Sequence, residues 1–147
     1  MSNYQASKKH VLALNTFVKL VRSTNSVCMD VHKHFLAELT VSQFGILEAL
    51  YHLGPMSQKE LAAKILKSPG NITTIINNLE KVNLVKREVK SEDKRYCTIS
   101  LTKKGLSTIE RIFPTHADIL LKRMSVLTEI EQHTLGKLLK KLSTTTP

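Results

Sequence analysis

Tryptophan is absent from the 147-residue sequence, and aromatic residues make up only 5% of it. Hydrophobic residues still reach 41%, so the chain can build a core, and that core must consist mainly of Leu, Ile and Val. The sequence has no apolar run of about 18 or more residues, which excludes a transmembrane helix. Its N-terminus lacks the basic region and long apolar run of a signal peptide. We therefore expect a cytoplasmic protein that makes no contact with membranes.

Cysteine is equally scarce, and the groups on which most enzymes depend are missing. Cys28 and Cys97 lie far apart and match neither a zinc-finger nor a CxxC spacing. Reduced thiols are the ordinary state of such residues inside the cell. No nucleophile–base pair, glycine-rich phosphate loop or pair of carboxylates is evident. The sequence thus predicts a protein that is not an enzyme and that carries no cofactor and no metal.

Positive charge is abundant and unevenly distributed. The net charge is +10, and residues 57–105 alone carry +6 of it. A basic block within a compact domain indicates a polyanionic partner, most often a nucleic acid.

Capping signals divide the chain into helices. Capping boxes at Thr40–Gln43, Ser57–Glu60 and Thr128–Glu131 each predict a helix start, and Ser68-Pro69 predicts another. A long helix should precede them, from about residue 4 to residue 36. Two β-branched segments, 84–89 and 96–101, flank a charged turn and predict a β-hairpin.

The order of these elements predicts a mainly α fold, a winged helix-turn-helix in which the hairpin is the wing. We expect one domain over residues 1–147, with the winged-helix core at about 40–105 and long helices in 1–37 and 106–147.

The segment SPGNITTIINNLEK (68–81) has one aliphatic side and one polar side that carries no negative charge. At 100° per residue, Ile72, Ile75, Ile76 and Leu79 form the buried stripe. The opposite side, here called the polar face, consists of Gly70, Thr74, Asn77 and Lys81, flanked by Thr73 and Asn78. Such a face suits the major groove of DNA, where Asn can read adenine bidentately and Thr can contact a thymine methyl group or a phosphate. The helix N-terminus adds backbone N–H groups for a phosphate.

The hairpin tip supplies a second candidate contact. Arg95 could enter a narrow minor groove, where negative potential is concentrated. Asp93 could hold its guanidinium in one orientation. The alternative is an exposed ion pair with no further role.

Residues 57–105 resemble the MarR family of bacterial transcription regulators. The features that carry the resemblance are L-A at Leu61-Ala62, N-L-E-K at 78–81, L-V-x-R at 84–87, D-x-R at 93–95 and L-T-x-x-G at 101–105. Two positions depart from the family pattern: Asn83 replaces a frequent glycine, and Lys94 replaces an arginine of the wing. Asn tolerates the left-handed conformation next best after glycine, so the turn should survive.

The resemblance implies a homodimer whose N- and C-terminal helices interlock, which makes 1–37 and 106–147 dimerisation helices. It also implies binding to double-stranded DNA at palindromic operators, usually as a repressor that is released by a small phenolic or other lipophilic effector. Carried over to this chain, the DNA-binding residues are Ser68, Pro69, Gly70, Asn71, Thr73, Thr74, Asn77, Lys81, Lys94 and Arg95, supported by Asp93. The expected effector pocket is lined by Phe17, Val21, Phe44, Leu47, Tyr51 and His52, all of which are otherwise explained as core or interface residues.

Three alternatives remain open. Cys28 could sense oxidants, although we expect a plain and partly buried cysteine, because nothing strongly basic lies near it in sequence. Cys28 and His32 have a metal-competent i, i+4 spacing, and His34 and His116 could complete a zinc site. A winged helix used only for protein–protein contacts is the third alternative, but such a surface would be expected to expose aromatic residues.

Overall fold

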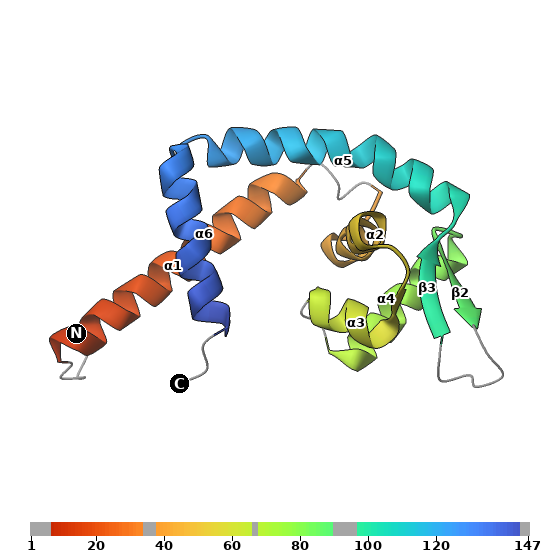
Figure 1. The fold of residues 1–147 in the computed structure, drawn as a ribbon, viewed down its shortest axis with the longest axis horizontal. Coiled ribbons are helices and arrows are strands. Elements are labelled where there is room, and N and C mark those ends of the chain that lie inside the picture. Colours follow the sequence, from red (N-terminus) through yellow and green to blue (C-terminus); the bar gives the residue numbers. More distant parts are fainter. Residues whose placement is uncertain (1–6, 34–37, 66–67, 90–96, 145–147) are drawn as a thin grey trace. The chain divides into compact units, whose positions relative to one another are not determined.

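The computed structural model describes residues 7–33, 38–65, 68–89 and 97–144 (Figure 1). It is mainly helical with one small antiparallel sheet, as predicted. In chain order, the elements are α1 (Lys8–His32), α2 (Val41–Leu53), β1 (Met56–Ser57), α3 (Gln58–Lys64), α4 (Pro69–Lys81), β2 (Val85–Val89), β3 (Cys97–Leu101), α5 (Lys103–Met124) and α6 (Glu129–Thr144). The chain forms two compact units, one of Phe35–Lys122 and one of Met1–His34 with Arg123–Pro147. We call them the central unit and the terminal unit.

The predicted hairpin is present, and it belongs to a three-stranded sheet. Strand order is β1-β3-β2, and both pairings are antiparallel. Val85 lies opposite Leu101 and Val89 lies opposite Cys97. The short strand β1, in which Met56 pairs with Ile99, was not predicted, because two residues are too few to show an alternating pattern.

Side-chain caps start the helices where the sequence predicts them. At α2, the Thr40 hydroxyl accepts from the Gln43 N–H and the Gln43 side chain accepts from the Thr40 N–H, which completes the capping box. The same reciprocal pair joins Ser57 to Glu60 at α3. At α4, Ser68 accepts from the Asn71 N–H and Pro69 occupies the first turn. These caps satisfy N–H groups that have no partner within the helix.

The core of the central unit consists of aliphatic side chains from α2, α3, α4, the sheet and α5. Those that are almost completely buried are Ile46, Leu47, Leu61, Ile72, Ile76, Leu79, Val85, Ile99 and Ile109. This agrees with the Leu-, Ile- and Val-rich core expected from the composition. The core fixes α4 through its aliphatic stripe and leaves the other side of that helix free for contacts.

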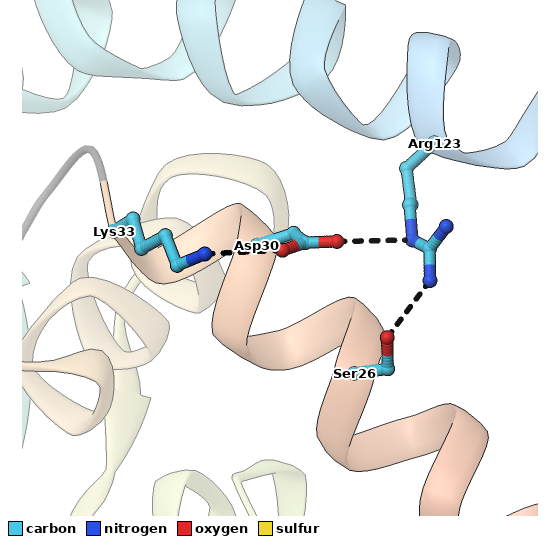
Figure 2. Close-up of polar contacts among 4 residues, drawn as sticks. All are labelled: Ser26, Asp30, Lys33 and Arg123. Atoms are coloured by element: carbon cyan, nitrogen blue, oxygen red, sulfur yellow. Dashed lines mark hydrogen bonds and ion pairs between the residues drawn. The ribbon is translucent and has the colours of Figure 1, made fainter.

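In the terminal unit, a polar cluster joins the end of α5 to α1 (Figure 2). The Nε atom of Arg123 lies 3.4 Å from a carboxylate oxygen of Asp30, and its Nη2 atom donates to the Ser26 hydroxyl at 2.9 Å. Lys33 lies 3.4 Å from the other oxygen of Asp30. One guanidinium therefore holds two positions, one turn apart, on α1.

The terminal unit also exposes much apolar surface. No residue of α6 is buried, and Ile130 is 79% exposed. On α1, Phe17 is 62% exposed. Apolar side chains at helical spacing are ordinarily covered, so one copy of the chain leaves this surface without a partner among the described residues.

Candidate nucleic-acid interface

The two sides of α4 are separated as the sequence predicts. Ile72, Ile75, Ile76 and Leu79 are buried, whereas the polar face is exposed except for the half-buried Thr73. Ser68 and Asn71 are exposed as well, and Pro69 begins the helix. The described candidates for DNA contact therefore line up along one side of a helix that is anchored from behind.

Contacts within the central unit hold two threonines of this helix. The Nε2 atom of Gln58, at the start of α3, donates to the Thr73 hydroxyl. The Thr74 hydroxyl lies 3.4 Å from the Gly70 carbonyl oxygen, to which it donates. The first bond joins the two helices of the helix-turn-helix, so it helps to fix the angle at which α4 is presented.

Arg87 on β2 contacts the polar face, and we did not predict this from the sequence. Its Nη2 atom donates to the Asn77 side-chain oxygen at 2.6 Å, and its Nη1 atom forms an ion pair with Glu80. Asn77 and Glu80 lie one turn apart on α4, so a single guanidinium spans both. Glu80 is half-buried, between the buried stripe and the exposed polar face. The alternation along β2, which places Arg87 on the same side as the buried Val85, was the available signal.

Side-chain hydrogen bonds to backbone carbonyl groups fix the C-terminal end of α4 against the start of α5. Asn83 has φ 58°, so it adopts the left-handed conformation expected at this position. The Thr102 hydroxyl donates to the Asn83 carbonyl oxygen at 2.6 Å, and Lys104 Nζ donates to the Val82 carbonyl oxygen at 2.9 Å. Thr102 also accepts from the Gly105 N–H at 2.9 Å and so caps α5. The L-T-x-x-G sequence at 101–105 thus serves to join α4, the sheet and α5.

Lys94, Arg95 and Asp93 lie outside the described residues. The described parts of β2 and β3 end at the Val89–Cys97 pair, which leads directly into the segment that contains them. Their assignment to the wing tip remains a prediction.

Exposed lysines lie on α3, α4, β2 and the first turn of α5. Lys59, Lys64, Lys81, Lys86, Lys103 and Lys104 are all exposed. Lys86 forms an ion pair with its neighbour on the same strand, Glu88. The helix-turn-helix, the strand β2 and the start of α5 therefore each carry exposed positive charge of the kind that a phosphate backbone attracts.

An aromatic cluster joins α2 to α5 within the central unit. The rings of His52 and Phe113 lie 4.7 Å apart, and those of Phe44 and His116 lie 4.6 Å apart. Tyr51 lies 6.0 Å from Phe113 and is 38% exposed. Of the six residues expected at an effector pocket, Tyr51 and His52 belong to this cluster together with the buried Phe44, whereas Leu47 lies in the core. Phe17 and Val21 belong to α1 in the terminal unit, where both are exposed.

Cys28 differs from the expectation. It is a free thiol and is exposed on α1, not partly buried, because no described element of the single chain covers that side of the helix. In the part of the chain that the structure describes, no group of three or more His, Cys, Asp or Glu side chains could hold a metal ion. Of the proposed zinc ligands, His34 and the His32 side chain lie outside that part. His116 is buried in the central unit against Phe44.

Among the described helices, none is long and apolar enough to cross a bilayer.

Comparison with known proteins agrees with these features. The sequence model of the MarR family matches residues 39–96, which contain α2, α3, α4 and β2. The HTH-type transcriptional regulator MhqR of Bacillus subtilis (strain 168) is 32% identical over 131 residues, covering 88% of this chain and 90% of that protein. The chain belongs to the MarR family. It is therefore a DNA-binding transcriptional regulator with a winged-helix fold, as the resemblance of its sequence implied.

Solved structures share the fold. The MarR-family regulator Sco3205 from Streptomyces coelicolor, determined in complex with DNA, has a TM-score of 0.78 and 20% identity and covers 97% of this chain and 90% of that chain. BpsR of Bordetella bronchiseptica, whose DNA binding is regulated by 6-hydroxynicotinic acid, has a TM-score of 0.77 and 20% identity and covers 99% of each chain.

Proposed function

We propose that this MarR-family regulator acts as a homodimeric repressor that releases a palindromic operator when a small hydroxylated aromatic compound binds. The observation that carries the proposal is the polar face of α4, which is exposed and free of negative charge and belongs to a unit with exposed lysines on α3, α4, β2 and α5. Major-groove recognition requires these properties together. Binding to chromosomal DNA would place the protein in the cytoplasm.

The exposed apolar surface of the terminal unit supports a dimer. Its exposed apolar side chains on α1 and α6 are too many for a monomer in water. A second copy of the chain can cover this surface, because it carries a matching apolar surface and is present at the same concentration. Twofold pairing is the commonest arrangement of soluble oligomers. Two recognition helices related by a twofold axis read a palindrome, which gives the operator its expected symmetry.

The aromatic cluster of α2 and α5 supports an aromatic effector. Rings that stack edge to face, such as His52 and Phe113, suit a flat aromatic ligand. The Tyr51 hydroxyl and the His52 imidazole can hydrogen-bond a phenolic oxygen. Regulation of BpsR by a hydroxylated aromatic acid is consistent with this class. Phe44, whose ring lies 4.6 Å from that of His116 in the same cluster, is proposed as an apolar part of the site.

Fluorescence anisotropy provides the test. The protein is titrated into the labelled DNA upstream of its own gene and into scrambled DNA, across a salt series. We expect tight binding to the first DNA only, one dimer per site, with affinity that falls steeply as salt rises. Addition of hydroxylated aromatic acids and phenols should then release the DNA. Equal, weak binding to both DNAs, followed by failure of a genomic selection to yield any site, would contradict the proposal.

Oxidant sensing is the second candidate, because the Cys28 thiol is free and exposed. The same assay with peroxide distinguishes it. Release by peroxide from the unmodified protein but not from Cys28→Ser would assign the response to this thiol, and the aromatic compounds would then have no effect.

A further inference from the structure

The contact between Arg87 and Asn77 has consequences for which base the protein selects. An arginine guanidinium only donates hydrogen bonds, so the atom of Asn77 that lies 2.6 Å from it must be the amide oxygen. The orientation of the Asn77 amide is thereby fixed by chemistry. Its oxygen faces β2, and its NH2 group occupies the other end of the amide.

Glu80 keeps Arg87 in this position. Its carboxylate pairs with Nη1 while Nη2 contacts Asn77, so the planar guanidinium is held at two points one helical turn apart. The Arg87 side chain is only 29% exposed, which limits competition from water. Hydrogen bonds to a charged partner are roughly twice as strong as neutral ones. Asn77 is thus part of a pre-organised group, although it lies on the exposed polar face.

An asparagine held in this way presents donors to the groove. Bidentate recognition of adenine needs the amide oxygen to accept from adenine N6 while the amide nitrogen donates to N7. Arg87 occupies one of the two lone pairs of this oxygen and turns the carbonyl group toward β2, so the end of Asn77 that points away from β2 is the NH2 group. That group matches base edges that present acceptors without a neighbouring donor, which are O6 and N7 of guanine and O4 of thymine. Adenine also offers N7 as an acceptor, but its N6 amino group beside N7 then lacks the amide oxygen as a partner.

We propose that Arg87 is a positioning residue that determines base specificity by holding the Asn77 amide oxygen, so that Asn77 selects guanine or thymine and not adenine. The inference rests on the proposed binding of α4 in the major groove. It replaces our expectation that Asn77 would read adenine bidentately. It also differs from a purely structural role of Arg87, which would affect the stability of the fold and the affinity for all sequences alike.

In vitro selection from randomised palindromic duplexes tests the inference on the full-length protein. Asn77→Ala first identifies the base position that Asn77 reads, because the preference there should disappear. Arg87→Met, which keeps the aliphatic stem and removes all donors, should shift that same position toward adenine. A bidentate pair is worth ~1–3 kcal/mol, so the relative preference for adenine should rise by about 5- to 150-fold. In the Asn77→Ala background, Arg87→Met should change nothing further at that position.

Two further variants keep the test decisive if Arg87→Met folds poorly. Arg87→Lys retains the charge, but its compact ammonium cannot span both Glu80 and Asn77 with a planar fork, so it should show the same shift. Lys86→Met, on the adjacent and exposed position of β2, removes one charge without touching Asn77. It should lower affinity for all sequences and leave base preference unchanged.

The outcomes separate the inference from the proposed function. Selection of a defined site by the unmodified protein, with the adenine shift in both Arg87 variants, supports the inference. The same base at the Asn77 position in the unmodified protein and in both Arg87 variants overturns the inference alone. An Asn77→Ala variant that keeps every base preference of the unmodified protein also overturns the inference alone. Failure of the unmodified protein to select any sequence overturns the proposed function and the inference with it.

Discussion

Gly105 packs directly on the backbone of Leu84: a Cβ atom at this position would lie 1.9 Å from the Leu84 carbonyl oxygen. No side chain fits there, and the obstacle is backbone, which cannot move aside like the end of a flexible side chain. The contact joins the first turn of α5 to the residue that leads from α4 into β2. Since Thr102 and Lys104 bind the neighbouring carbonyl groups of Asn83 and Val82, the end of α4 and the start of α5 form one rigid joint.

Gly105→Ala should therefore destabilise the protein strongly. We expect a loss of about 2–4 kcal/mol in the free energy of unfolding, because the substitution forces α5 away from β2 and breaks the adjoining hydrogen bonds. Urea denaturation without DNA measures it. Gly70→Ala is the matched control: an added Cβ there meets nothing within 4 Å, and stability should stay the same or rise by up to ~1 kcal/mol. Equal stability of both variants would contradict the close packing.

Arg95→Ala tests the wing. If Arg95 enters the minor groove, the variant should bind the operator more weakly by ~1–3 kcal/mol. Anisotropy at fixed salt gives this difference. Arg22→Ala, on α1 of the terminal unit, removes one positive charge far from the hairpin in sequence and serves as the control for net charge. A loss in Arg95→Ala no larger than that in Arg22→Ala would exclude a groove contact. The loss of operator affinity in Asp93→Asn should be smaller than that in Arg95→Ala and larger than that in Arg22→Ala.

Acid should weaken the α3 capping box. Bonds from the Ser57 hydroxyl and backbone N–H lower the pKa of Glu60 from its ordinary value of 4.5. A lowered pKa in the folded state means that the bond stabilises the fold above 4.5, and that this stabilisation is lost as pH falls through the lowered value. Glu60→Gln keeps the capping geometry, as Gln43 does at α2, but cannot titrate.

Denaturant midpoints measured from about pH 6 down to about pH 3 should therefore fall less in Glu60→Gln than in the unmodified protein. Glu110→Gln neutralises an exposed carboxylate of α5. Its denaturant midpoint should fall over this pH range as much as that of the unmodified protein. A Glu60→Gln curve parallel to the unmodified one would show that the capping carboxylate does not contribute to acid sensitivity.

Much of the fold could be predicted because short-range chemistry determines it. Each capping box joins residues three apart, and each is found where the sequence places it. The aliphatic stripe of α4 follows in the same way from helical spacing. Strand β1 escaped prediction because its two residues are strand only through their pairing with β3.

The candidate DNA-binding site could be predicted only where local periodicity determines it. The exposed residues of α4 follow from its periodicity, but their partners do not. Arg87 contacts Asn77 across ten residues of chain and Gln58 contacts Thr73 across 15, through the packing of β2 and α3 on α4. No local pattern specifies which polar atom of Asn77 is occupied, and base selection depends on that detail.

The apolar stripe of α6 provides the test of dimerisation. Leu135, Leu138, Leu139 and Leu142 share one side of the helix, and no residue of α6 is buried in the single chain. Leu138→Asp combined with Leu142→Asp should give a monomer in sedimentation experiments, because two carboxylates cannot be buried without partners. Operator affinity should fall by at least about 100-fold, since the two half-sites are then bound independently.

His133→Asp places one carboxylate on the opposite side of α6 and serves as the control, so it should remain dimeric. If the double variant stayed dimeric with unchanged affinity, the α6 stripe would not be the dimer interface. If the double variant became monomeric but kept full affinity for the operator, operator recognition would not require a palindrome. The combination of sedimentation and anisotropy therefore tests the oligomer and the symmetry of the operator separately.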